Sequence, residues 1–103
     1  MIYRQGDVLL VKCNEIPKQC EEVKIQDRIV LAYGEVTGHA HAIYDTKKAV
    51  LMKYANSDNF FLLITESVDL KHEEHDKINL PSGNYQVIRQ REYTPEKPRY
   101  VAD

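Results

Sequence analysis

The sequence predicts an all-β fold, a small single-domain β-barrel or sandwich of about seven mainly antiparallel strands with little helix. Short apolar runs rich in Val, Ile, Leu, Phe and Tyr recur along the chain, and polar segments that contain turn-forming residues separate them. No long segment repeats its apolar residues with helical spacing. The 103 residues fit one hydrophobic core, so we expect residues 1–103 to form one domain.

The first half of the chain contains three segments with the composition of strands. Residues 7–13 are a mostly apolar run entered through a glycine, and residues 29–33 are a compact apolar run that ends at a glycine. Between them, residues 14–28 are polar and allow only a short helical turn. Residues 35–44 should continue extended, and Gly38 indicates a bulge or a close backbone approach.

Two polar turns organise the middle of the chain. The first leads into residues 49–55 and the second into residues 60–65. Together with residues 35–44, these segments predict a meander of three antiparallel strands. The run Phe60 to Ile64 is apolar on both parities, which predicts a central strand buried on both faces.

The last elements follow the same logic. Residues 68–72 have the composition of another short strand. The segment 79–84 contains a proline and a glycine at the positions typical of a type I turn, and residues 85–93 form the last long strand. The tail, residues 94–103, contains two prolines and should be irregular or docked as an extended arm.

Charge and cysteine content limit the function classes. The formal net charge is −2, with 16 acidic and 14 basic residues mixed along the chain, which argues against an extended nucleic-acid-binding surface. No apolar run approaches the roughly 20 residues that cross a bilayer, and no secretory leader is evident at Met1. Cys13 and Cys20 have no metal-binding spacing and are expected to be free thiols. We expect a cytoplasmic protein without membrane contact.

The histidines concentrate the chemistry of the sequence. All 4 fall into two tight pairs, His39 with His41 and His72 with His75. Imidazole titrates near neutral pH and is the commonest transition-metal ligand in proteins. The two pairs therefore predict one composite site that the fold assembles.

Strand parity indicates which histidines share a face. Residues two apart on a strand point the same way, so His39 and His41 are co-facial, and His72 continues the core-facing parity of residues 68–72. His75 lies three residues further on and reaches the same face only if the chain bends after His72. Three converging imidazoles and a conditional fourth are expected.

A divalent transition metal is the leading hypothesis, because three protein ligands with one open position are typical of a catalytic zinc. Zinc, manganese, iron and nickel all remain open as the metal. Metal-dependent hydrolysis is the expected chemistry, with the histidines as catalytic residues. The candidate ligands are His39, His41, His72, His75, Glu73, Glu74 and Asp45.

Two alternatives stay open. In the first, histidines act without metal as acid and base in a phosphodiesterase or ribonuclease that acts on RNA or a nucleotide, and Arg89, Arg91 and Tyr93, which share a strand parity, bind the phosphate. A solvated strand face is the ordinary explanation of this arginine pair. In the second, the domain is a non-catalytic module that uses an exposed β edge and its proline-containing tail to bind a partner or a second copy of itself.

Two resemblances bear on these hypotheses. His39-Ala-His41 after Gly34 resembles the opening of the first cupin motif, but Asp45 stands where that motif has Glu and the second cupin motif is missing. A wider resemblance covers nearly the whole chain, and a family of small bacterial and phage proteins carries its motifs. They are Arg-Gln-Gly-Asp-Val-Leu-Leu at 4–10, Gly-His-Ala-His-Ala at 38–42, His-Glu-Glu-His at 72–75, and Leu-Pro-x-Gly-x-Tyr-x-Val-x-Arg-Gln-Arg-Glu-Tyr-Thr-Pro at 80–95. The resemblance implies that the histidine pairs and the arginine segment belong to one design, but it implies no substrate or cofactor.

Overall fold

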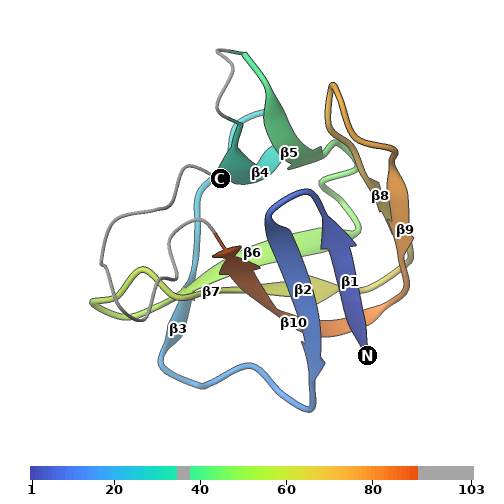
Figure 1. Ribbon diagram of the computed structural model, residues 1–103. Helices are drawn as coiled ribbons and strands as arrows, with labels where there is room; N and C mark the ends of the chain where they lie inside the picture. Colours follow the sequence, from blue (N-terminus) through green and yellow to red (C-terminus); the bar gives the residue numbers. More distant parts are fainter. Residues whose placement is uncertain (35–37, 91–103) are drawn as a thin grey trace.

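Ten strands and no α-helix lie in the part of the chain that the structure, a computed structural model, describes, which is residues 1–34 and 38–90 (Figure 1). The longer strands are β2 (Val8–Cys13), β4 (Ile29–Tyr33), β6 (Ala49–Tyr54), β7 (Phe60–Ile64) and β10 (Gly83–Arg89). The shorter strands are β1 (Ile2–Gln5), β3 (Cys20–Glu22), β5 (Ala40–Ile43), β8 (Val68–Leu70) and β9 (Ile78–Leu80). The predicted all-β class is confirmed, and the strands beyond the expected seven are short ones.

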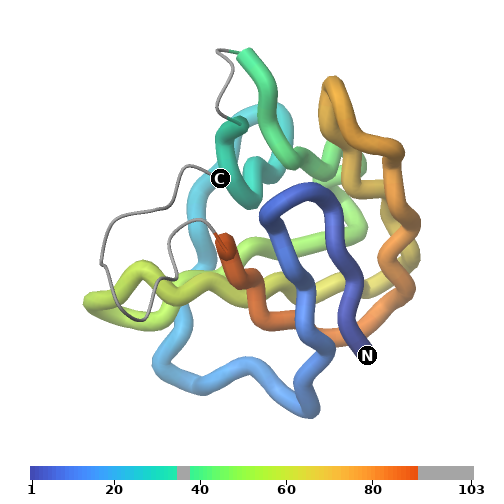
Figure 2. Tube along the Cα trace, in the orientation of Figure 1, coloured from blue at the N-terminus to red at the C-terminus, as the bar shows by residue number. Residues whose placement is uncertain are grey.

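The strands form two layers. A six-stranded antiparallel sheet has the order β1-β2-β10-β7-β6-β3. β4 pairs with β5, β8 pairs with β9, and a bridge between Ala42 and Lys71 connects the two pairs. Figures 1 and 2 show these two pairs beside the hairpin of β1 and β2, and the N-terminus lies at the free edge of that hairpin.

The apolar core lies between the layers. The alternation of β2 turns Val8 and Leu10 inward, and both are fully buried. β7 contributes Leu62, which is 0% exposed, and the second layer contributes Ile43 from β5 and Leu70 from β8. Because these side chains come from both layers, burial of the core holds the small β4–β5 and β8–β9 pairs against the large sheet.

The predicted three-strand meander is wrong in one part. β6 and β7 do pair as neighbouring antiparallel strands, but β5 pairs with β4 and contacts Lys71 instead of β6. All four residues of β5 are buried. β4 pairs with one edge of this strand, and Lys71 forms a bridge to Ala42 on the other edge. This displacement of β5 from the large sheet carries His41 to the interface of the layers.

Three further sequence expectations need correction. β7 is a central strand, but only Leu62 and Ile64 are buried, while Phe61 and Leu63 are half-buried on the other face. The segment 14–28 contains β3 and no helix. The bulge of the β4–β5 hairpin lies in β4 after Val30, and not at the glycine that precedes β5.

Two observations complete the description. In residues 1–34 and 38–90 no helix has the length and apolar character needed to span a membrane. Cys13 and Cys20 are half-buried free thiols, as expected, and burial raises the pKa of both.

Candidate functional site

The rings of all four histidines form one connected cluster where the two layers meet. His72 is at the centre, with its ring centroid 4.3 Å from that of His41, 4.6 Å from that of His75 and 5.6 Å from that of His39. The bend that His75 needs is present at residues 73–75. His41 is buried, His39 and His72 are half-buried, and His75 is exposed, so the cluster runs from the interior to the surface.

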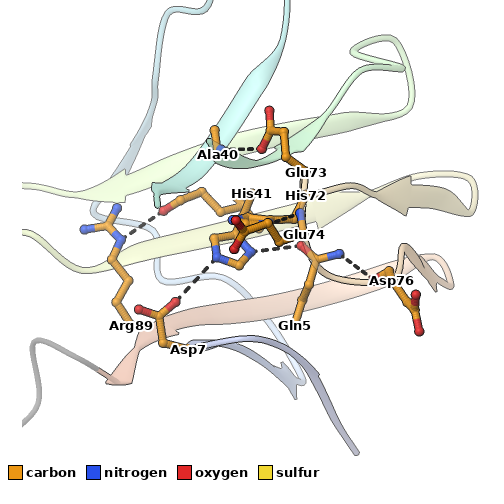
Figure 3. A network of polar contacts seen from close by, with 10 residues as sticks. Gln5, Asp7, Ala40, His41, His72, Glu73, Glu74, Asp76 and Arg89 are labelled. Atoms are coloured by element: carbon orange, nitrogen blue, oxygen red, sulfur yellow. Dashed lines mark hydrogen bonds and ion pairs between the residues drawn. The ribbon is translucent and has the colours of Figure 1, made fainter. Parts of the chain in front are cut away.

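The position of His41 is fixed by Gln5 at the end of β1. His41 Nδ1 lies 2.9 Å from Gln5 Oε1, and the Gln5 amide nitrogen donates to the carbonyl oxygen of Asp76 at 3.0 Å (Figure 3). The same nitrogen donates to the carbonyl oxygen of Leu70 at 2.8 Å. Because both N–H groups of the amide are used, Oε1 must accept the proton of His41 Nδ1. In its neutral form His41 therefore carries its lone pair on Nε2.

The turn between β1 and β2 brings a carboxylate and a glycine to this ring. Asp7 Oδ1 lies 3.4 Å from His41 Nε2 (Figure 3). Gly6 has a φ of +59°, and a Cβ atom at this position would lie 2.6 Å from His75 Nε2 and 3.2 Å from His41 Cε1. Both the backbone conformation and the lack of space therefore require glycine here.

His72 has the opposite proton arrangement to His41. The backbone N–H of Glu74 donates to His72 Nδ1 at 3.0 Å, so the proton of the neutral ring lies on Nε2. Burial, and next the neighbouring charge of His75, lower the pKa of His72, while the Glu73 carboxylate opposes this shift. The ring packs against Gly34, where a Cβ atom would lie 3.2 Å from His72 Nε2.

Two carboxylates border the exposed side of the cluster. Glu73 Oε1 accepts the backbone N–H of Ala40 at 2.9 Å, and this hydrogen bond lowers the pKa of Glu73. Glu74 Oε2 lies 3.7 Å from His39 Nδ1. Within the described part of the chain, His39, His72 and Glu73 form a group with metal-binding geometry, since one ligand atom from each lies within 4.8 Å of the others.

The remaining candidates lie elsewhere. Asp45 follows β5 and pairs with Lys48 at 3.3 Å. Arg89 donates from Nε to the carbonyl oxygen of Leu31 at 2.9 Å, and its guanidinium carbon lies 4.9 Å from the ring centroid of Phe60. Arg89 also lines a surface hollow of ≈ 570 Å³. Its role in substrate binding stays a prediction, and Arg91, Tyr93 and the tail 94–103 lie outside the described residues.

Sequence reasoning assigned no role to two residues that touch the cluster. Gln5 and Asp7 belong to the Arg-Gln-Gly-Asp motif that precedes the first long strand, where an aspartate after a glycine predicts only a turn. β1 was not expected, so the parity that buries Gln5 was not visible. The sequence signal that could have identified these two residues is a glutamine followed by a glycine and an aspartate at a strand turn.

Comparison with known proteins places the chain in a family without defining an activity. A search of the curated proteins and a search of the solved structures found no match. A family model does match residues 4–90, a range that includes both histidine pairs, Gln5 and Asp7. The chain belongs to the family described as Domain of unknown function (DUF8820).

Proposed function

We propose that the protein binds a divalent transition metal at the histidine cluster and uses it for hydrolysis. The observation that carries this proposal is the group of His39, His72 and Glu73, whose ligand atoms lie within 4.8 Å of one another although the residues come from different segments. Two imidazoles and one carboxylate suit zinc, manganese, iron or nickel, and three protein ligands leave a position open for a water or substrate.

The local contacts of Glu73 and His39 favour the forms of these side chains that bind metal. The Ala40 N–H keeps Glu73 ionised, and burial favours the neutral form of His72. His72 would ligate through Nδ1, or through Nε2 once the proton of the ring moves to Nδ1, and in either case the hydrogen bond from the Glu74 N–H has to break. The Glu74 carboxylate at 3.7 Å favours a proton on His39 Nδ1, which leaves His39 Nε2 for a metal.

The chemistry divides between the metal and the neighbouring residues. A bound divalent metal acidifies water and polarises the bond to be cleaved. His41, whose ring centroid lies 4.3 Å from that of His72, carries its lone pair on Nε2 in the neutral form and accepts a proton there when that atom holds no metal. Glu73, Glu74 and His75 are exposed, which gives a substrate access to this end of the cluster.

Metal binding is tested with tag-free protein that has been stripped by a chelator and reconstituted with zinc, manganese, iron or nickel. We expect stoichiometric metal by elemental analysis. Glu73→Gln and His39→Ala should each lower the metal affinity by more than the roughly 10–100-fold that is typical of an outer-shell change. Glu66→Gln is the matched control, because this exposed carboxylate pairs with Lys48 instead. No bound metal after reconstitution would refute the proposal.

Hydrolysis is tested separately with chromogenic esters, bis(p-nitrophenyl) phosphate and p-nitrophenyl acetate. Turnover should require the metal, return on reconstitution after chelation, and fall in Glu73→Gln but not in Glu66→Gln. If the protein binds stoichiometric metal but its turnover equals that of the free metal, metal binding is supported and the hydrolytic part of the proposal is rejected.

The opposite proton arrangements of His41 and His72 favour a second candidate. A ring with a lone pair on Nε2 packs against a ring with a proton on Nε2, which is the pairing that metal-free acid and base catalysis on RNA or a nucleotide needs. Cleavage of a short RNA in excess chelator, lost in His41→Ala and in His72→Ala, would support this candidate. Absence of cleavage in chelator would remove it.

A further inference from the structure

We propose that the turn between β1 and β2 completes a second cation site in the cluster, with His41 Nε2 and the Asp7 carboxylate as ligands of a divalent transition metal. Gln5 is its positioning residue. The site shares the histidine cluster with the proposed function, but its ligands differ from His39, His72 and Glu73. Each of the two sites can therefore exist without the other.

The first step is the direction of His41. The Gln5 amide nitrogen is bound by the carbonyl oxygens of Leu70 and Asp76, so a flipped amide would place its oxygen against two other oxygens. The amide oxygen consequently faces His41 Nδ1 at 2.9 Å and accepts its proton. A histidine that ligates through Nε2 usually donates Nδ1–H to such an outer-shell acceptor.

The second step is the spacing of the two donors. His41 Nε2 and Asp7 Oδ1 are 3.4 Å apart. Two ligands of a tetrahedral metal with bonds of about 2.0–2.1 Å lie roughly 3.3–3.4 Å from each other. The separation of these two donors is therefore that of two ligands of one metal ion, and the carboxylate supplies negative charge for a cation.

The third step is the space around these donors. The Asp7 side chain is 31% exposed while the His41 side chain is 2% exposed, so an ion enters from the Asp7 side and reaches a buried nitrogen. Gly6 adds no side chain, and a Cβ atom at this position would lie 2.6 Å from His75 Nε2. The ring of His75 is nearly parallel to that of His41, with centroids 5.9 Å apart, which makes His75 a further candidate ligand after a ring rotation.

The two ligand sets share no residue but are adjacent. The ring centroid of His72 lies 4.3 Å from that of His41 and 5.6 Å from that of His39. Adjacent metal positions of this kind are used by hydrolytic enzymes to hold an attacking and a leaving oxygen together. The inference thus gives the Arg-Gln-Gly-Asp motif a binding role.

The test is zinc titration of the full, tag-free, chelator-stripped chain by calorimetry and elemental analysis. We expect two zinc ions per chain, one in Asp7→Asn and one in Glu73→Gln. Gln5→Leu should weaken only the site that Asp7→Asn removes, by roughly 10–100-fold. Asp45→Asn is the matched control and should keep both ions, because Asp45 pairs with Lys48.

The outcomes separate this inference from the proposed function. One zinc ion lost in Glu73→Gln but kept in Asp7→Asn overturns the second site and leaves the first. One zinc ion lost in Asp7→Asn but kept in Glu73→Gln supports the second site and rejects the first. If Asp7→Asn does not fold, the ¹⁵N imidazole spectrum of the wild type decides: zinc must shift His41 Nε2 while Nδ1 stays protonated, and an unshifted Nε2 overturns the inference.

Discussion

The apolar core and the histidine cluster are adjacent, and β5 contributes to both, with Ile43 in the core and His41 in the cluster. In the core, side chains such as Leu62 and Leu10 are held by burial, which has no direction. In the cluster, His41 is held by one hydrogen bond whose acceptor is itself fixed by two others. The stability of the core therefore depends on how much apolar volume is buried, whereas the arrangement of the cluster depends on which atom donates each hydrogen bond.

This difference explains how polar groups are buried without penalty. Gln5 is 3% exposed and His41 is 2% exposed, yet among the described residues no buried side-chain nitrogen or oxygen lacks a hydrogen-bond partner. A fully satisfied network specifies one arrangement, while a partly satisfied one is costly. Changes in the two regions should thus differ in kind as well as in size.

The largest effect on stability is expected in the core. Leu62→Ala removes a fully buried side chain of a central strand and should lower the free energy of unfolding by about 2–5 kcal/mol. Leu63→Ala, on the half-buried face of the same strand, is the control and should cost clearly less. Urea denaturation measures both, and equal losses would contradict the two-layer core. Zinc stoichiometry of the folded fraction should stay unchanged in Leu62→Ala.

Gln5→Leu tests the cluster in the opposite way. The volume is kept, but His41 Nδ1 and the carbonyl oxygens of Leu70 and Asp76 lose their partner. We expect a loss of about 1–3 kcal/mol from unpaired buried groups, together with weaker zinc binding. Gln86→Leu, on the outer face of β10, should change stability by less than about 0.5 kcal/mol. Unchanged zinc binding in Gln5→Leu would mean that His41 is held by packing alone.

Alanine substitutions at two glycines separate the cost of backbone strain from the effect of a steric clash. Gly6 and Gly38 both have positive φ, at +59° and +91°, so alanine at either position costs about 1–3 kcal/mol. Only at Gly6 would the new Cβ atom approach His75 and His41, whereas no atom of the described residues lies within 4 Å of a Cβ at Gly38. Gly6→Ala should therefore shift the histidine resonances in an NMR spectrum, and Gly38→Ala should leave them in place. Equal shifts would contradict the contact.

The smallest effect concerns pH. Folding lowers the pKa of His72 below its ordinary value of 6.5, so the unfolded chain binds more protons as the pH falls through that value. The free energy of unfolding should decrease from pH 7.5 to 5.5, and less steeply in His72→Gln. The pKa of Glu73 lies below its ordinary value of 4.5, so the titration of Glu73 changes the free energy of unfolding only below this pH range. An identical slope in wild type and His72→Gln would show that His72 does not contribute.

Much of this organisation follows from local pattern. The alternation in 7–13 and the apolar run at 60–64 predicted β2 and β7. The common side of His39 and His41 stays a prediction, because β5 begins at Ala40 and strand parity does not extend to His39. The position of β5 was not predicted, because local pattern identifies a strand without naming its partner. Gln5 was missed for the same reason, since its role depends on Leu70 and Asp76, which are far away in the sequence.

By itself the sequence determined the all-β class and the main strands, and it identified the two histidine pairs as the candidate site. Only the tertiary structure decided that the bend after His72 brings His75 to the other rings, that Asp45 stays with Lys48, and that Asp7 faces His41. The physical reason is that strand parity is local, while the direction of a proton on a histidine nitrogen is set by acceptors that meet only when the layers pack. The approach of His41 Nε2 to the Asp7 carboxylate, at 3.4 Å, is a property of that packing.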